Sequence, residues 1–252
     1  MSNEVLVKQV GSVLVITINR PERHNAVTAD VIAGLTEAMK RLESDDSLEM
    51  GILTGSGRSF CSGMDLAYFA EMGDGDFASD GIDGLTDRRD DAKLLIGALE
   101  GYALAGGFEI ALCCDLIVAG KSVQFGLPEV KHGLVATAGS LFRLPRRIPR
   151  AVALELALTA GRLGAERAER LGLVNRLVED GSALEAALEL ASEIQQNSAT
   201  AVRATKTIMQ QSITLTDDEA FEAQHPLSFP IQASAEAKAG ALAFTTRKSS
   251  AN

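Results

Sequence analysis

The chain has 252 residues, of which 46% are hydrophobic, so it can bury the core of one large domain. Its formal net charge is −10 and it has no lysine- and arginine-rich stripe, which argues against a nucleic-acid-binding protein. The three cysteines show no disulfide pattern. The sequence also has no apolar run long enough for a membrane span and no signal-peptide pattern. These features predict a globular cytoplasmic protein that does not associate with membranes.

The first two-thirds of the chain alternates predicted strands and helices, a pattern typical of a parallel sheet. Residues 5–10 and 13–18 are expected to form a hairpin. A helix with its apolar face over 31–42 follows, with Thr28 as its N-cap. The remaining predicted elements are strands at 50–54, 94–104, 116–119 and 123–125, and helices near Met64 and at 106–113.

The last third is predicted to be mostly helical, beginning near residue 136. The predicted elements are helices at 149–159, 165–171, 183–197 and 199–211, and one strand at 174–178. Pro226 and Pro230 are expected to break the chain before a final helix at 233–245. Residues 73–91, rich in aspartate and glycine, predict a mobile surface segment that could act as a lid.

Two glutamates follow backbone turns that could stabilise a negative charge. Before Glu109, two glycines stand where an apolar strand should turn into a helix, leaving free N–H groups at the positive end of the helix dipole. Glu129 ends the segment 124–129. Such turns can stabilise a developing oxyanion, and a nearby carboxylate can transfer protons. Without further context, Glu109 could be an ordinary helix residue and Glu129 a helix N-terminal acid.

Several other signatures are incomplete. Residues 55–60 begin like a dinucleotide-binding fingerprint, but Phe60 occupies the position of its third glycine. The three histidines have no metal-ligand spacing with the cysteines, and there is no Gly-x-Ser-x-Gly segment. We therefore expect neither a metal site nor a serine hydrolase built around a nucleophile elbow.

Six motifs occur in one order along nearly the whole chain. They lie at residues 20–26 (RPERHNA), 60–66 (FCSGMDL), 101–110 (GYALAGGFEI), 114–115 (CD), 125–129 (FGLPE) and 165–175 (AERAERLGLVN). Any one of them is weak evidence, but together the chain strongly resembles the enoyl-CoA hydratase/isomerase family, also called the crotonase family.

This resemblance implies an α/β fold, a crotonase-like spiral of ββα turns with a helical C-terminal region that drives trimerisation. It implies a catalytic spiral core over residues 1–195 that binds an acyl-CoA thioester, and an oligomerisation region over 196–252, within one continuous family domain. It also implies a homotrimer or a dimer of trimers. No cofactor is expected, because coenzyme A is part of the substrate.

Matched position by position, the resemblance implies an oxyanion hole made by the backbone N–H groups of Met64 and Gly106. It gives Glu109 and Glu129 acid–base roles and places the backbone of Ser62 at the adenine. The further candidates for binding substrate or coenzyme A are Arg23, Asp65, Phe244, Arg247 and Lys248.

Some of these candidates have a simpler interpretation. Arg23 is the preferred cation because it lies in the motif at 20–26, but it could equally be a solvated loop residue. Asp65 is better explained as a helix cap. Phe244, in the final helix, is expected to line the coenzyme A pocket of a neighbouring subunit.

We expect an enoyl-CoA hydratase, a hydro-lyase that adds water syn across the double bond of a 2-enoyl-CoA, or the reverse dehydratase. Two carboxylates near one water can divide water activation and proton delivery between them. A double-bond isomerase of the same family and a non-catalytic acyl-CoA binder stay open. An isomerase commonly needs one carboxylate, so the presence of two favours hydration. A Clp-type serine protease shares the spiral, but the neighbourhood of Met64 offers no serine–histidine pair.

The sequence departs from the family pattern beside the second glutamate. After Glu129, the family's usual glycine-rich helix start is replaced by residues 134–140 (LVATAGS). This replacement is expected to change the wall next to the acyl group. It therefore affects the choice of substrate more than the chemistry.

Overall fold

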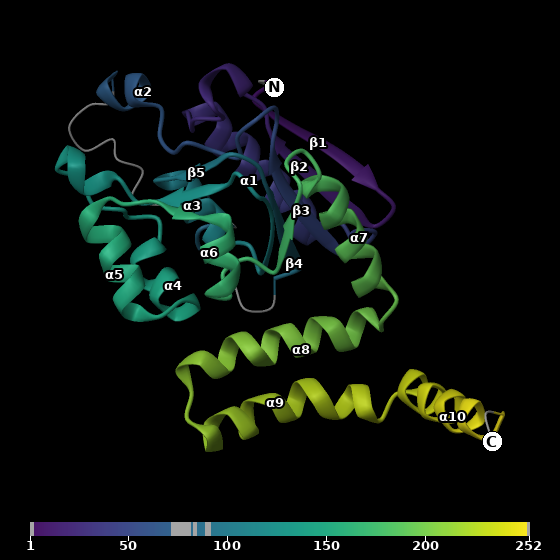
Figure 1. Cartoon of the computed structure of the whole chain (residues 1–252). Helices are drawn as coiled ribbons and strands as arrows, with labels where there is room; N and C mark the ends of the chain where they lie inside the picture. The colour runs from purple at the N-terminus through teal and green to yellow at the C-terminus, as the bar shows by residue number, and fades with distance from the viewer. Residues whose placement is uncertain (1–2, 72–81, 83–84, 89–91, 251–252) are drawn as a thin grey trace. The chain divides into compact units, whose positions relative to one another are not determined.

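The computed structural model describes residues 3–71, 82, 85–88 and 92–250, with side chains described up to residue 243. The chain divides into two compact units (Figure 1). The first comprises Met1–Arg89 and Lys93–Ser192, and the second comprises Asp90–Ala92 and Glu193–Asn252. The predicted lid at 73–91 lies outside the described residues, apart from 82 and 85–88.

The first unit is built around a six-stranded sheet with the order β1-β2-β3-β4-β6-β9. Its strands are β1 (Val5–Val10), β2 (Val13–Ile18), β3 (Met50–Gly55), β4 (Leu94–Leu99), β6 (Leu116–Gly120) and β9 (Arg176–Val178). β1 and β2 form the predicted antiparallel hairpin, and the other neighbours pair in parallel. Nearly every residue of β2, β3 and β4 is buried, as expected for parallel strands covered on both faces.

A second sheet of three short strands contains β5 (Tyr102–Leu104), β7 (Gln124–Gly126) and β8 (Leu163–Gly164). The chain passes from β4 into β5 and then into helix α3 (Gly106–Leu112). It passes similarly from β6 into β7 and then into the short 3-10 helix η2 (Glu129–His132). Each passage is one strand–strand–helix turn, so successive turns bring equivalent connections side by side.

The prediction of one continuous strand over residues 94–104 is wrong. The chain bends at Gly101, which has a φ of 54°. A Cβ at this position would lie 2.0 Å from the carbonyl oxygen of Arg58. Only glycine fits both the left-handed backbone and this close approach, and the bend carries the chain from the large sheet into the small one.

Helices connect the strands of the first unit. They are α1 (Ala29–Ser44), α2 (Leu66–Glu71), α3, α4 (Ser140–Arg147), α5 (Arg150–Thr159), α6 (Ala165–Arg170) and most of α7 (Ala183–Gln195), with the short η1 (Pro21–Arg23) between β2 and α1. Helix α1 buries the apolar face expected from its periodicity, and Thr28 Oγ1 accepts a hydrogen bond from the N–H of Val31 as its N-cap. α4 was not predicted as a separate helix.

The second unit contains α8 (Ala199–Gln211), η3 (Ser212–Thr214), α9 (Asp217–Gln232) and α10 (Ala235–Ser250). The predicted break at Pro226 and Pro230 is wrong, because both prolines lie inside α9. They stand four residues apart on an exposed face. The carbonyls that lose a donor belong to Glu222 and Pro226, both exposed, where solvent can replace the missing bond. A capping box between Thr216 and Glu219 stabilises the start of this helix.

Asn25 holds together the loop that leads from β2 towards α1. It is fully buried and has a φ of 56°. Its Oδ1 accepts a hydrogen bond from the N–H of Arg20 at 2.8 Å. Its Nδ2 donates to the carbonyls of Ser56 at 2.9 Å and Ser59 at 2.6 Å. One side chain therefore satisfies three backbone groups in two segments.

We predict that Asn25→Ala lowers the free energy of unfolding by about 2–3 kcal/mol, because buried backbone groups lose their partners. Urea unfolding of the purified protein measures this change. Asn19→Ala is the control in the same unit, since Asn19 donates one exposed hydrogen bond to the carbonyl of Asn3 and should matter by at most about 1 kcal/mol. Equal stability of the two variants would contradict the bridging role of Asn25.

Candidate active site

A strained turn joins β5 to α3 and positions the start of that helix. Its central residue, Ala105, has φ 49° and ψ −129°, a conformation that residues other than glycine rarely adopt. The N–H of Ala105 donates to the carbonyl of Gly126 at 2.9 Å, which fixes the turn to β7. The turn places Gly106 at the first position of the helix, where N–H groups have no partner within the helix.

The segment around Met64 lies directly against this turn. Gly63 has a φ of 98°, and a Cβ there would lie 2.7 Å from Ala105 Cβ and 3.2 Å from the nitrogen of Gly106. The carbonyl of Gly63 and the N–H of Asp65 are both hydrogen-bonded to Val27, at 2.8 and 2.9 Å. These bonds hold the backbone on both sides of Met64.

The two predicted oxyanion donors therefore lie close together. A Cβ built on Gly106 would lie 3.8 Å from the nitrogen of Met64. In the described part of the chain, neither the N–H of Met64 nor that of Gly106 donates a hydrogen bond to a protein acceptor. Neighbouring backbone donors that are fixed by packing can stabilise a developing oxyanion.

Glu109 lies in the first turn of α3 and is 4% exposed. Its Oε1 accepts two hydrogen bonds from Ser140, one from the N–H at 3.1 Å and one from the hydroxyl at 2.9 Å. Burial raises the pKa of Glu109. The two Ser140 donors, the backbone of Ala138 and the positive charge of Arg143 oppose that rise. Glu109 is thus a buried carboxyl that is also provided with donors for its ionised form.

Glu129 begins η2, directly after β7, and is half-buried. Its Oε2 is buried and has no hydrogen-bond partner among the described residues. Burial raises the pKa of Glu129, and the negative charge of Glu109 raises it further. The two carboxyl groups therefore lie close enough to interact electrostatically, and their environments differ.

The predicted coenzyme A contacts near Met64 also lie together. Arg23 is exposed at the end of η1, and its carbonyl accepts a 3.5 Å hydrogen bond from the hydroxyl of Ser62. The N–H of Ser62 donates to the carbonyl of His24 at 3.0 Å. The structure thus places Arg23 beside Ser62, two residues before Met64, but their contacts with coenzyme A stay predictions.

Asp65 has the capping geometry expected from the sequence. Its Oδ1 accepts from the N–H of Ala67 at 3.1 Å, at the start of α2, and its Oδ2 pairs with Arg20 at 3.0 Å. Its role in substrate binding stays a prediction. The same holds for Phe244, Arg247 and Lys248, because their side chains lie outside the described residues.

A serine–histidine pair that the sequence analysis missed lies close to these residues. His24 Nδ1 is 3.0 Å from Ser59 Oγ, and the rings of His24 and Tyr102 pack in a T-shaped arrangement with centroids 5.5 Å apart. The sequence predicts no nucleophilic serine–histidine pair near Met64, and this contact does not supply one. Ser59 is only 3% exposed, so its hydroxyl is poorly placed to attack a substrate.

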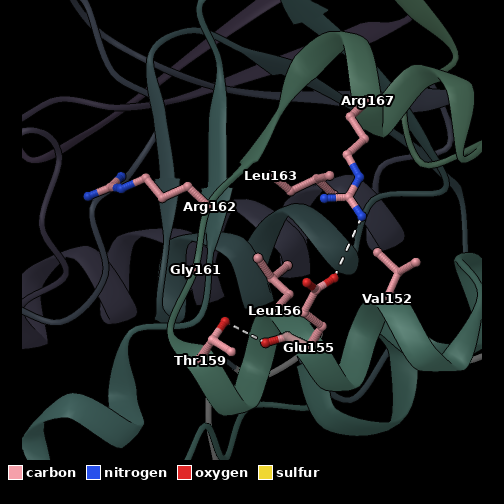
Figure 2. Close-up of a pocket in the computed structure, with 8 residues that line it drawn as sticks. All are labelled: Val152, Glu155, Leu156, Thr159, Gly161, Arg162, Leu163 and Arg167. Carbon is pink, nitrogen blue, oxygen red and sulfur yellow. Dashed lines mark hydrogen bonds and ion pairs between the residues drawn. The ribbon is translucent and has the colours of Figure 1, made fainter.

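Figure 2 shows a pocket of about 90 Å³ formed by α5, the segment before β8, and α6. Thr159 Oγ1 donates to the carbonyl of Glu155 at 2.6 Å, and the carboxylate of Glu155 lies 3.7 Å from the guanidinium of Arg167. The Arg162 side chain points away from this pair. The pocket contains neither glutamate of the candidate site, and its ion pair is exposed, so it offers no comparable chemistry.

The described residues hold no group of three or more histidine, cysteine, aspartate or glutamate side chains arranged to bind a metal ion. None of the helices in this part of the chain has the length and apolar character needed to cross a membrane.

Comparisons with known proteins identify relatives of this chain. Residues 8–251 match the family model for enoyl-CoA hydratase/isomerase. The chain is 37% identical to the enoyl-CoA hydratase EchA19 of Mycobacterium tuberculosis, over 97% of this chain and 94% of that protein. It is also 37% identical to a carnitinyl-CoA dehydratase of Proteus mirabilis, over 99% of this chain and 98% of that protein.

A solved structure agrees with this relationship. The enoyl-CoA hydratase EchA1 of Mycobacterium marinum superposes with a TM-score of 0.90 and 52% identity, covering 98% of this chain and 97% of that chain. The chain belongs to the enoyl-CoA hydratase/isomerase family, and the predicted spiral fold is confirmed. The prediction of an enzyme of the hydro-lyase class is confirmed as well.

Because the pKa of Glu129 is raised, its ionised form should lower the free energy of unfolding of the protein. The folded protein holds this proton more tightly than the unfolded chain, so stability is lost as pH rises above the ordinary value of 4.5 and through the folded pKa. Glu129→Gln should therefore raise the melting temperature by a few degrees at about pH 7.5, with little effect at about pH 4. Differential scanning calorimetry at both pH values measures this difference.

Glu22→Gln is the matched control, because Glu22 is exposed on η1. It should change the melting temperature little at either pH. A Glu129→Gln protein that is less stable than the unaltered protein at neutral pH would show that the charge of Glu129 is stabilised by its surroundings.

Proposed function

We propose that this enzyme adds water syn across the C2–C3 double bond of a 2-enoyl-CoA, or catalyses the reverse dehydration. The observation that carries the proposal is the electrostatic interaction between Glu109 and Glu129, together with the close approach of Gly106, three residues before Glu109, to the backbone nitrogen of Met64. The relatives named hydratase and dehydratase support the same reaction class.

The backbone donors would act on the thioester carbonyl. Attack of water at C3 gives this oxygen enolate-like negative charge, and the N–H groups of Met64 and Gly106 would stabilise it. Because both donors belong to a packed backbone, they need little reorganisation during the reaction and cannot titrate. Loss of one such donor typically costs about 3–4 kcal/mol of transition-state stabilisation.

The different surroundings of the two glutamates suggest how they share the proton transfers. Glu109 accepts two hydrogen bonds on one oxygen, which favours its carboxylate form and suits it to take a proton from water. Glu129 has a buried oxygen with no hydrogen-bond partner among the described residues, and the charge of Glu109 favours its protonated form.

In the addition, the oxygen of water bonds to C3 while Glu109 takes its proton. Glu129 delivers a proton to C2 as the enolate collapses. Transfer of one proton from Glu109 to Glu129, directly or through solvent, restores the starting state. With the water and both carboxyls on one face of the double bond, the product is the syn adduct.

Substrate binding and assembly belong to the same proposal. Arg23 would pair with a phosphate of coenzyme A, and the backbone of Ser62 would contact the adenine. The second unit carries large exposed apolar side chains that a homotrimer or a dimer of trimers would cover. They are Met209, Ile213, Phe221, Phe229 and Leu242. Association through these side chains would remove apolar surface from water.

We predict that Glu109→Gln and Glu129→Gln each lower kcat for crotonyl-CoA hydration by at least ~10²-fold, because each removes one proton-transfer group. KM should change little. The loss of absorbance of the enoyl thioester measures the rate. Glu155→Gln is the control, since its exposed carboxylate lies in the separate pocket of Figure 2.

Near-native hydration by either active-site variant would contradict the two-carboxylate mechanism. A variant that no longer hydrates but still moves the double bond of a 3-enoyl-CoA would favour the isomerase reaction. Tight binding of acyl-CoA by an unaltered protein that turns over neither substrate would favour a non-catalytic binder.

A further inference from the structure

Helix α4 begins with a buried serine that contacts the carboxylate of Glu109. Ser140 has no exposed surface, and its N–H and hydroxyl both donate to Oε1 of Glu109. The preceding Gly139 has a φ of 108°, and a Cβ there would lie 2.0 Å from Nη1 of Arg143. This glycine allows the chain to turn sharply and bring the first residue of α4 against Glu109.

Three other charged or titratable groups face Glu109. They are Glu129 on η2, Arg143 on α4, and Cys113, whose Sγ lies 3.2 Å from the backbone carbonyl oxygen of Glu109. Arg143 donates its hydrogen bonds to the carbonyls of Ala138 and Thr86. Within the described residues, Ser140 is therefore the side chain that hydrogen-bonds the Glu109 carboxylate.

The two donors restrict this carboxylate more than one donor would. A single N–H would fix one distance but would leave the carboxylate free to turn about that bond. A second donor on the same oxygen limits this rotation and leaves Oε2 without a bond to Ser140. The second donor is the hydroxyl of Ser140, which a glycine at this position could not supply.

We propose that Ser140 is a positioning residue for Glu109: its hydroxyl holds Oε1 so that Oε2 is presented to the reacting water. This inference rests on the proposed hydration mechanism. It adds a named residue that orients the base and helps to keep it ionised. Ser140 itself would not contact the substrate.

Ser140→Ala tests the proposal because it removes the hydroxyl and keeps the N–H. The ionised form of Glu109 loses one donor, so its pKa should rise. The acidic limb of the pH profile of kcat/KM for crotonyl-CoA should then move upward by about one pH unit, and kcat should fall about tenfold, with KM nearly unchanged. Ser140→Thr keeps a hydroxyl and should return the limb towards its original position.

Thr54→Val is the matched control. Thr54 is also buried, and its hydroxyl donates to the carbonyl of Ala98 at 2.8 Å, within the large sheet. The variant should lose stability without moving the acidic limb. If Ser140→Ala folds poorly, Ser140→Cys offers a side chain of similar size that donates weakly, and it should give a smaller shift in the same direction.

Infrared titration of the carboxyl band of Glu109 separates this proposal from the proposed function. Glu109→Gln identifies the band, and no substrate is needed. A higher titration midpoint in Ser140→Ala than in the unaltered protein supports the contact between Ser140 and Glu109, whether or not crotonyl-CoA is hydrated. Absence of hydration by the unaltered protein would refute the proposed reaction and not this contact. An unchanged midpoint and an unchanged acidic limb in a folded Ser140→Ala protein would overturn the proposal for Ser140.

Discussion

The close approach of two backbone segments determines the geometry of this site. Gly63 packs against the strained turn at Ala105 with no room for a side chain between them. Gly107, two residues after Ala105, is equally crowded. A Cβ there would lie 2.2 Å from the carbonyl oxygen of Cys61, so the start of α3 is tightly packed as well. Because this packing fixes the helix start, it also fixes the N–H of Gly106 and the position of Glu109 one turn later.

A backbone framework of this kind allows the site to bury two carboxyl groups. Burial raises the pKa of both glutamates, and the cost of ionising them is offset unequally. Glu109 receives donors from Ser140, whereas one oxygen of Glu129 has no hydrogen-bond partner in the part of the chain that the structure describes. In the proposed mechanism, this difference gives one base and one acid from the same residue type. The stability that the charge of Glu129 is predicted to cost then follows from the reactivity that this mechanism requires.

The sequence was most informative where local patterns are decisive. The hairpin of β1 and β2, the apolar face and cap of α1, and the helix after Gly106 follow from periodicity and capping. The bend at Gly101 was missed because the apolar residues on both sides read as one strand, and the need for glycine comes from distant Arg58. The prolines of α9 were misread because local preference does not reveal that their face is exposed.

For the site too, the sequence reveals what local motifs encode and misses contacts between distant segments. Glu109, Glu129, Met64 and Gly106 were predicted because short motifs surround them. The proposed role of Ser140 depends on a contact 31 residues away along the chain, and the His24–Ser59 pair spans 35 residues. No local pattern encodes contacts of this kind, although the unusual segment 134–140 did mark the place where Ser140 lies.

The central claim is that water and a proton are added to one face of the substrate by two carboxyl groups. Hydration of crotonyl-CoA in D₂O, with the product analysed by proton NMR, tests it most directly. The account predicts one deuterium at C2, on the same face as the new hydroxyl at C3. Deuterium on both faces of C2, or exchange at C4 without formation of a hydroxyl, would contradict it.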